Sequence, residues 1–189
     1  MSRFRLAALA VAFTAAACAT FGLPPRAPLP FDLSGRVVVS YDGRAFSSGL
    51  RWHHLPAQDE IWLLAPLGQA LAHIASSDEG ATVTGLDRRQ YRGADVEALT
   101  RQALGWELPL TRLQYWARGE LAPGSPAQDV QRDTQGRITA FAQNDWRVRL
   151  ERYPQDEHEG LPRRIELNRA GNESIRLIID DWRKVATAP

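Results

Sequence analysis

The sequence has almost no cysteine and almost no lysine. Cys18 is the only cysteine among 189 residues, so no disulfide can form within one chain. Lys184 is the only lysine, so arginine supplies nearly all of the 23 basic residues, which balance 22 acidic ones. Because the arginines are scattered and balanced by acids, the composition argues against a nucleic-acid-binding protein.

Long apolar runs are also absent. The most apolar stretch, Leu6 to Ala16, is shorter than the roughly 20 residues that span a bilayer, and it follows the basic residues Arg3 and Arg5. This order predicts a secretory signal peptide over residues 1–17. The segment ends in Ala-Ala-Ala-Cys at 15–18, which resembles a bacterial lipobox with Cys18 as the acylated first residue of a lipoprotein. An ordinary cleavage site that happens to precede a cysteine is the alternative.

We expect residues 18–31 to form a lipidated tether and residues 32–189 to form a single domain. Four prolines between positions 24 and 30 favour an extended tether. The residue after Cys18 is Ala19 and not aspartate, which would be expected in an inner-membrane lipoprotein. In this respect the sequence resembles Gram-negative lipoproteins of the outer membrane. We therefore expect a protein on the periplasmic face of that membrane, anchored by the covalent lipid at Cys18 and without any other cofactor.

Short alternating runs separated by turns dominate the rest of the chain. Apolar and polar residues alternate on both sides of Asp42-Gly43, a dipeptide typical of hairpins. About eleven strands are predicted, at 36–41, 46–52, 60–65, 69–76, 80–85, 88–92, 128–133, 137–143, 146–153, 163–169 and 174–182. This near-regular spacing predicts a mainly β (α+β) fold, with an antiparallel sheet curled into a barrel or half-barrel.

Two segments show helical spacing instead. Residues 95–104 carry Val96, Leu99 and Ala103 on one face, with an aspartate at the start and a glycine after the end. Residues 109–118 carry a second apolar stripe and begin with a proline, which suits the first turn of a helix. Two amphipathic helices in a β protein can bury their stripes against the concave face of the sheet, so we expect them to form a lid.

Motifs of catalysis and metal binding are missing. The sequence has no G-x-S-x-G elbow, no glycine-rich phosphate loop and no H-E-x-x-H. His53 and His54 are adjacent in a predicted strand, so their side chains face opposite ways. His73 and His158 lack neighbours at the spacing of zinc ligands. We therefore predict neither an enzyme nor a metal protein; a divergent lipase or esterase is disfavoured because no nucleophile and base can be named.

Tryptophan, by contrast, is abundant, and one turn carries an unexpected leucine. Six tryptophans in one small domain form either an ordinary core or the walls of an apolar cavity. Ala65-Pro66-Leu67-Gly68 reads as a tight turn between strands, with proline second and glycine fourth. Leu67 would then occupy the tip of a hairpin, where polar residues are usual. Folding back onto a neighbouring loop is the alternative for this side chain.

An ordered set of segments resembles the LolB family of outer-membrane lipoprotein receptors. It comprises the lipobox, Leu50-Arg51-Trp52, Leu63 to Gly68, Leu108 to Trp116, Asp145 to Val148, and Ile175 to Trp182. The resemblance covers most of residues 34–185. It implies an incomplete antiparallel β-barrel with a helical lid over an apolar cavity for acyl chains. The family usually has a helix before the first strand, where this chain has only the proline-rich stretch, so either the lid is smaller or the tether covers the rim.

The resemblance also implies a function. Cargo lipoproteins would arrive from the periplasmic carrier LolA and pass into the outer membrane, with the chain acting as a monomer. Leu67, held by Pro66 and Gly68, would promote membrane insertion. The candidate acyl-cavity residues are Trp52, Leu99, Leu113, Trp116, Trp146 and Trp182. The alternative from a different class is a structural outer-membrane lipoprotein that packs its tryptophans and docks to an assembly complex.

Overall fold

The computed structural model describes residues 29–185, except residue 86 and residues 153–159. The predicted signal peptide, Cys18, the tether before Leu29, and His158 lie outside the described residues. Phe31, the last residue of the predicted tether, is the first residue of a strand and only 2% exposed, because its aromatic side chain is buried in the core.

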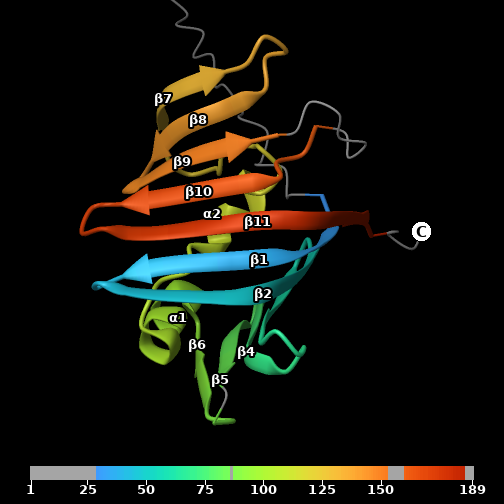
Figure 1. Ribbon diagram of the computed structural model, residues 1–189, viewed down its shortest axis with the longest axis vertical. Coiled ribbons are helices and arrows are strands. Elements are labelled where there is room, and N and C mark those ends of the chain that lie inside the picture. Colours follow the sequence, from blue (N-terminus) through green and yellow to red (C-terminus); the bar gives the residue numbers. More distant parts are fainter. Residues whose placement is uncertain (1–28, 86, 153–159, 186–189) are drawn as a thin grey trace, which may run out of the picture.

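One antiparallel sheet of eleven strands forms the body of the molecule (Figure 1). The strands are β1 (Phe31–Tyr41), β2 (Arg44–Leu55), β3 (Gln58–Leu64), β4 (Ala70–Ser77), β5 (Gly80–Gly85), β6 (Gln90–Gly93), β7 (Ala127–Arg132), β8 (Ile138–Gln143), β9 (Trp146–Glu151), β10 (Arg164–Arg169) and β11 (Glu173–Lys184). The order across the sheet is β6-β5-β4-β3-β2-β1-β11-β10-β9-β8-β7. The first and last strands therefore pair in the middle, and β6 and β7 are the two edges. The predicted eleven-stranded, incompletely closed sheet is confirmed.

Alternation of buried and exposed residues defines the inner face of this sheet. In β9, Trp146, Val148 and Leu150 are buried while the arginines between them are exposed. In β1, the residues with odd numbers point inward, from Phe31 to Val39. Because side chains alternate along a strand, each strand gives one apolar face to a common core.

A bulge between β1 and β11 changes the alternation at one point. Ser34 pairs with Asp181 and Gly35 with Ile179, so Asp180 is the extra residue of the bulge. Before the bulge Ile175, Leu177 and Ile179 are buried, and after it Trp182 is buried. The extra residue thus turns Trp182 toward the core, where uninterrupted alternation from Ile179 would point it outward.

The two helices lie on one face of the sheet (Figure 1). In the sequence they come between β6 and β7, the two edge strands. Helix α1 (Val96–Leu104) packs on β5 and β6, and α2 (Leu110–Trp116) follows before the chain enters β7. Since β6 and β7 are opposite edges, this connection must cross the sheet. Helix α2 ends two residues earlier than predicted, because the chain turns at Gly119, whose φ of 78° is left-handed.

Candidate functional site

The turn between β3 and β4 holds one leucine in solvent. Gly68 N donates to the carbonyl of Ala65 at 2.8 Å, and Ala65 N donates to the carbonyl of Gln69 at 2.8 Å. Gly68 has a φ of 82°, which glycine adopts without strain. The Leu67 side chain is 91% exposed, so it does not fold back onto a neighbouring loop. Local hydrogen bonds and the restricted backbone of Pro66 therefore fix an apolar tip that makes almost no contact with the protein.

Helix α1 is fixed at both ends by residues that the sequence supplies locally. The Asp95 carboxylate accepts a hydrogen bond from Ala98 N at 3.1 Å, and this bond is the main cause that lowers the pKa of Asp95. Gly105 ends the helix in the left-handed region. These contacts match the predicted start and end of the helix.

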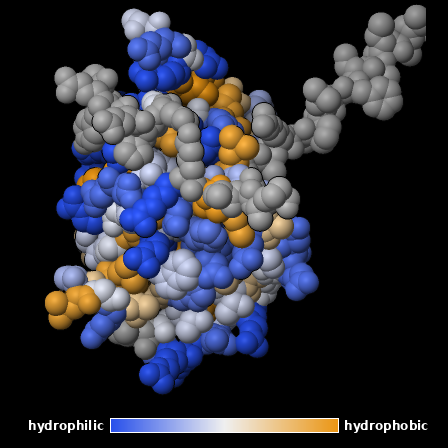
Figure 2. Space-filling model, turned by 90° about the vertical axis from the view of Figure 1, so that its right-hand side faces the viewer, coloured by the Kyte–Doolittle hydropathy of each residue, from blue (hydrophilic) through white to orange (hydrophobic). Residues whose placement is uncertain are grey.

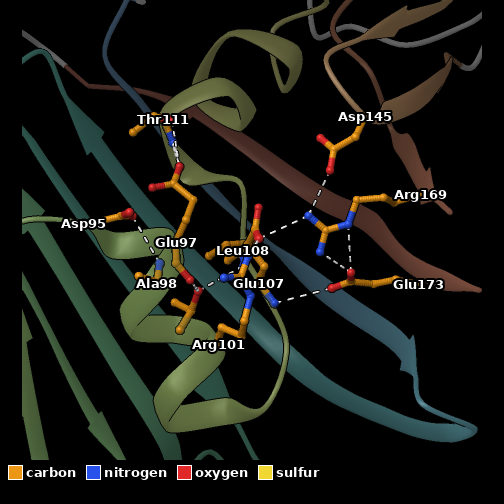
Figure 3. Close-up of polar contacts among 11 residues, drawn as sticks. Asp95, Glu97, Ala98, Arg101, Glu107, Leu108, Thr111, Asp145, Arg169 and Glu173 are labelled. Carbon is orange, nitrogen blue, oxygen red and sulfur yellow. Dashed lines mark hydrogen bonds and ion pairs between the residues drawn. The ribbon is translucent and has the colours of Figure 1, made fainter. Parts of the chain in front are cut away.

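Polar side chains connect α1 to α2 (Figure 3). The Glu97 carboxylate accepts hydrogen bonds from the backbone N and the hydroxyl of Thr111, at 3.0 and 2.6 Å. The hydroxyl oxygen of Thr100 accepts from Leu108 N at 3.0 Å. Because Thr111 lies in the first turn of α2, its bond from the backbone N satisfies a donor that a helix start leaves free. Together the three bonds link the two helices.

An ion-pair network fastens the connection between the helices to the sheet (Figure 3). Arg169, in β10, pairs with Glu107 at 3.1 Å and Asp145 at 3.2 Å, and also pairs with Glu173. Arg101 of α1 pairs with the same Glu107 carboxylate. The Arg169 guanidinium also lies 4.6 Å from the ring centre of Trp146. This network was not predicted, since its members are spread from residue 101 to residue 173.

The predicted cavity residues are all buried in one hydrophobic core, and one of them also lines a pocket. Trp52, Trp116 and Trp146 are at most 1% exposed and belong to the closed core, which Leu99 and Leu113 also join. Trp182, 6% exposed, belongs to the same core and also lies on the wall of a pocket, where its indole N donates to the carbonyl of Pro162 at 2.9 Å. Of the six candidates, only Trp182 lines this pocket. Leu67 does not line it either.

This pocket opens where β1 begins and β11 ends, and its volume is about 1020 Å³. Its apolar wall is made by Phe31, Leu121, Ile138, Leu161 and Trp182, and Leu29 and Pro30 lie at its margin. The same end of the molecule faces the viewer in Figure 2, where apolar surface is flanked by polar side chains. The residues that end the tether therefore border the pocket.

Five arginines and one glutamate, Glu120, form the charged part of the pocket wall. The arginines are Arg118, Arg132, Arg137, Arg152 and Arg183. Sequence reasoning missed them because they come from five separate segments and none stands in a recognisable motif. The combination of an apolar wall and guanidinium groups suits an amphiphilic ligand more than a purely apolar or a purely charged one.

The histidines are held by other contacts. His54 Nδ1 lies 2.8 Å from Asp59 Oδ1, which also accepts from the Trp52 indole at 2.6 Å. His73 stacks on Trp62 with ring centres 4.9 Å apart. Among residues 29–185, with the gaps given above, no group of three metal-ligating side chains occurs. Within the same residues, no helix has the length and apolar character needed to cross a bilayer.

Comparison with known proteins places this architecture in a family. The model of the family described as "Outer membrane lipoprotein LolB" matches residues 30–182. The outer-membrane lipoprotein LolB of Nitrosomonas europaea is 38% identical over 156 residues, covering 81% of this chain and 72% of the relative. That of Chromobacterium violaceum is 32% identical over 185 residues, covering 94% and 98%.

Solved structures with low sequence identity share the fold. A LolA superfamily protein from Nitrosomonas europaea superposes with a TM-score of 0.51 at 12% identity, covering 86% of this chain and 88% of that one. A DUF1329 family protein from Desulfovibrio piger gives a TM-score of 0.52 at 8% identity, with the same coverage. At such identities the likeness concerns the fold alone.

Proposed function

Because this chain belongs to the LolB family of outer-membrane lipoproteins, we propose that it receives lipoproteins from the periplasmic carrier LolA and passes them into the outer membrane. In this proposal Cys18 carries the lipid that anchors the protein, and the Pro66-Leu67-Gly68 turn contacts the bilayer during transfer. The proposal includes no catalytic step and no cofactor beyond the covalent lipid.

The exposure of Leu67 is the observation that carries this proposal. A leucine that is 91% exposed contributes almost nothing to the folded core, while its turn is held by two hydrogen bonds of 2.8 Å. Burying a leucine side chain is worth roughly 1.5–3 kcal/mol. Acyl chains contribute about 0.8 kcal/mol for each buried methylene, so two of them bind far more strongly. Leu67 therefore acts locally in transfer, and the lipid anchor holds the protein at the membrane.

The apolar wall of the pocket supports the acyl-binding part of the proposal. Phe31, Ile138 and Trp182 are each at most 6% exposed and line the pocket, and the ring centres of Phe31 and Trp182 are 5.3 Å apart. In this proposal the cargo's acyl chains lie against that wall. Since Leu29 and Pro30 border the same pocket, the tether joins the domain next to the place where acyl chains would enter.

The test separates acceptance of cargo from its delivery. Purified Leu67→Glu protein is given a LolA–lipoprotein complex, first without membranes and then with liposomes of outer-membrane lipids. We expect normal transfer of cargo from the carrier to the variant, and loss of transfer into the liposomes. Val130→Glu is the matched control, because Val130 is also exposed, at 38%, but lies in the edge strand β7.

Two results would contradict the proposal in different ways. Normal delivery by Leu67→Glu would remove the membrane role of the turn. Failure of the unmodified protein to take cargo from the carrier would favour the alternative of a structural lipoprotein that docks to an assembly complex.

A further inference from the structure

Among the described residues, the pocket where β1 begins and β11 ends carries more positive charge than the carboxylates paired with it neutralise. Of its five arginines, three have a carboxylate partner: Arg137 pairs with Asp133 at 2.7 Å, Arg183 with Asp181 at 2.8 Å, and Arg118 with Glu120 at 3.6 Å. Among the described residues, no carboxylate is within ion-pair distance of Arg132 or Arg152. Two positive charges therefore remain without a counter-ion from this part of the chain.

The Arg152 guanidinium is held in place by backbone carbonyls. Its Nη1 donates to the carbonyl of Ile138 at 2.6 Å, and its Nε donates to that of Gly160. Its Nη2 lies over Gly119, where a Cβ atom would collide with it. Two carbonyls and a glycine thus fix the orientation of a charged group before any ligand arrives, and fixed donors lose less entropy on binding.

The charge on Arg152 is disfavoured by its surroundings. Burial is the first cause that lowers the pKa of Arg152, and the positive charge of Arg137 is the second, with Asp133 acting in the opposite direction. A bound anion would relieve both effects, since it would neutralise a partly buried cation next to another cation.

Arg118 offers a donor without an acceptor. Its side chain is only 16% exposed, and its Nε is buried with no hydrogen-bond partner among the described residues. The Glu120 carboxylate, at 3.6 Å, is beyond hydrogen-bond distance and is itself half exposed. A buried donor in a native protein normally has a partner, so an acceptor supplied by a ligand is the simplest explanation. Arg118 precedes Gly119 in the chain, Arg152 Nη2 lies against Gly119, and both arginines line the pocket.

We propose that this pocket binds an anionic phospholipid, with the acyl chain on the wall formed by Phe31, Ile138 and Trp182 and the phosphate group between Arg118 and Arg152. Arginine is suited to phosphate because its donors form a planar fork. The inference rests on the proposed function for the position of the acyl chain, and adds a preference for a negatively charged headgroup. It makes the site sensitive to the lipid composition of the membrane.

The test compares amphiphiles that differ only in headgroup charge. The mature chain carrying Cys18→Ala, which cannot be acylated, is titrated calorimetrically with dihexanoyl phosphatidylglycerol, dihexanoyl phosphatidylcholine and inorganic phosphate, each lipid below its micellar concentration. We expect the anionic lipid to bind about tenfold more tightly than the zwitterionic one, and phosphate alone to bind far more weakly than either. Arg118→Gln and Arg152→Gln should each abolish the preference, weakening the anionic lipid more than the zwitterionic one, whose phosphate also loses a contact.

Controls make every outcome decisive. Arg44→Gln removes the same charge from the exposed first residue of β2 and should keep the preference. If Arg152→Gln unfolds because it also loses two carbonyl contacts, Arg118→Gln decides. Equal binding of both lipids, or a preference that survives both substitutions, would overturn the headgroup assignment alone. Phosphate binding as tight as the anionic lipid would show a free-anion site and overturn it as well. Failure of both lipids to bind would also remove the acyl site of the proposed function.

Discussion

The indole nitrogen of Trp116 donates a hydrogen bond of 2.9 Å to the side-chain oxygen of Gln143, which joins α2 to β8 inside the core. The same amide accepts from Ala122 N at 3.1 Å and donates to the carbonyls of Ala122 and Ser125, at 2.6 and 2.8 Å. Gln143 is 1% exposed. One buried side chain therefore holds both the end of α2 and the segment between α2 and the edge strand β7.

We expect Gln143→Leu to destabilise the protein strongly. The leucine matches the size of the side chain but leaves three buried polar groups and the part-buried carbonyl of Ser125 without their partner. Each buried unsatisfied group costs about 1–3 kcal/mol. The free energy of unfolding, measured in urea, should fall by about 3 kcal/mol or more. Gln128→Leu, at an exposed position of β7, should change it by less than about 0.5 kcal/mol. Equal effects at both positions would contradict a structural role for the buried amide.

Replacing Arg169 by methionine should also destabilise the fold. Glu107 and Glu173 are at most 15% exposed in their side chains, so loss of the shared cation leaves poorly solvated carboxylates. Removing one partner of a buried ion pair costs about 3–5 kcal/mol. Arg36→Met is the comparison, because Arg36 and Asp180 are 3.8 Å apart and both more than half exposed. It should cost about 0–1 kcal/mol. Thermal unfolding of the two variants at the same ionic strength would measure the difference.

Gly35 should not accept a side chain. A Cβ at this position would overlap with the carbonyl oxygen of Ile178. This oxygen belongs to the backbone and has little freedom to move. We expect Gly35→Ala to destabilise the protein by about 3 kcal/mol, at the upper end of overpacking effects. Gly93→Ala places its methyl group at ordinary contact distance from Leu99 and should be tolerated. A fully stable Gly35→Ala protein would mean that the bulge at Asp180 is free to relocate.

Stability should decrease in acid, and Glu166 should account for part of the loss. Burial raises the pKa of Glu166, but hydrogen bonds and charge from Arg164 and Arg176 outweigh it, so the pKa lies below the ordinary 4.5. A carboxylate whose pKa is lowered by folding makes its full contribution to stability above the pKa that it has in the unfolded chain. This contribution disappears as the pH falls through the pKa that it has in the folded protein.

The pH dependence of urea unfolding tests this sign. Between neutral pH and about pH 3, the midpoint for Glu166→Gln should fall less steeply than for the unmodified protein. Glu79→Gln, in the exposed turn after β4, should give a curve parallel to that of the unmodified protein. A parallel curve for Glu166→Gln would exclude the contribution.

The strands, the helices and the exposed turn could all be predicted from local patterns. Alternation in β9 and helical spacing in α1 depend on neighbours within a few residues, as does the Pro-Leu-Gly turn. The environment of the tryptophans could not be predicted in the same way. Trp182 faces the core only because Asp180 bulges, and its place at the pocket depends on residues from β1, β8 and the segment after α2.

The sequence by itself determined the eleven strands, the two helices with their caps, and an apolar tip at Leu67, because hydrophobic periodicity and turn chemistry act over short distances. Tertiary structure alone decided which tryptophan of the core also borders the pocket, and which arginines gather there. These outcomes depend on strand register and on a crossing connection between opposite sheet edges, and both bring together residues that are far apart in the chain.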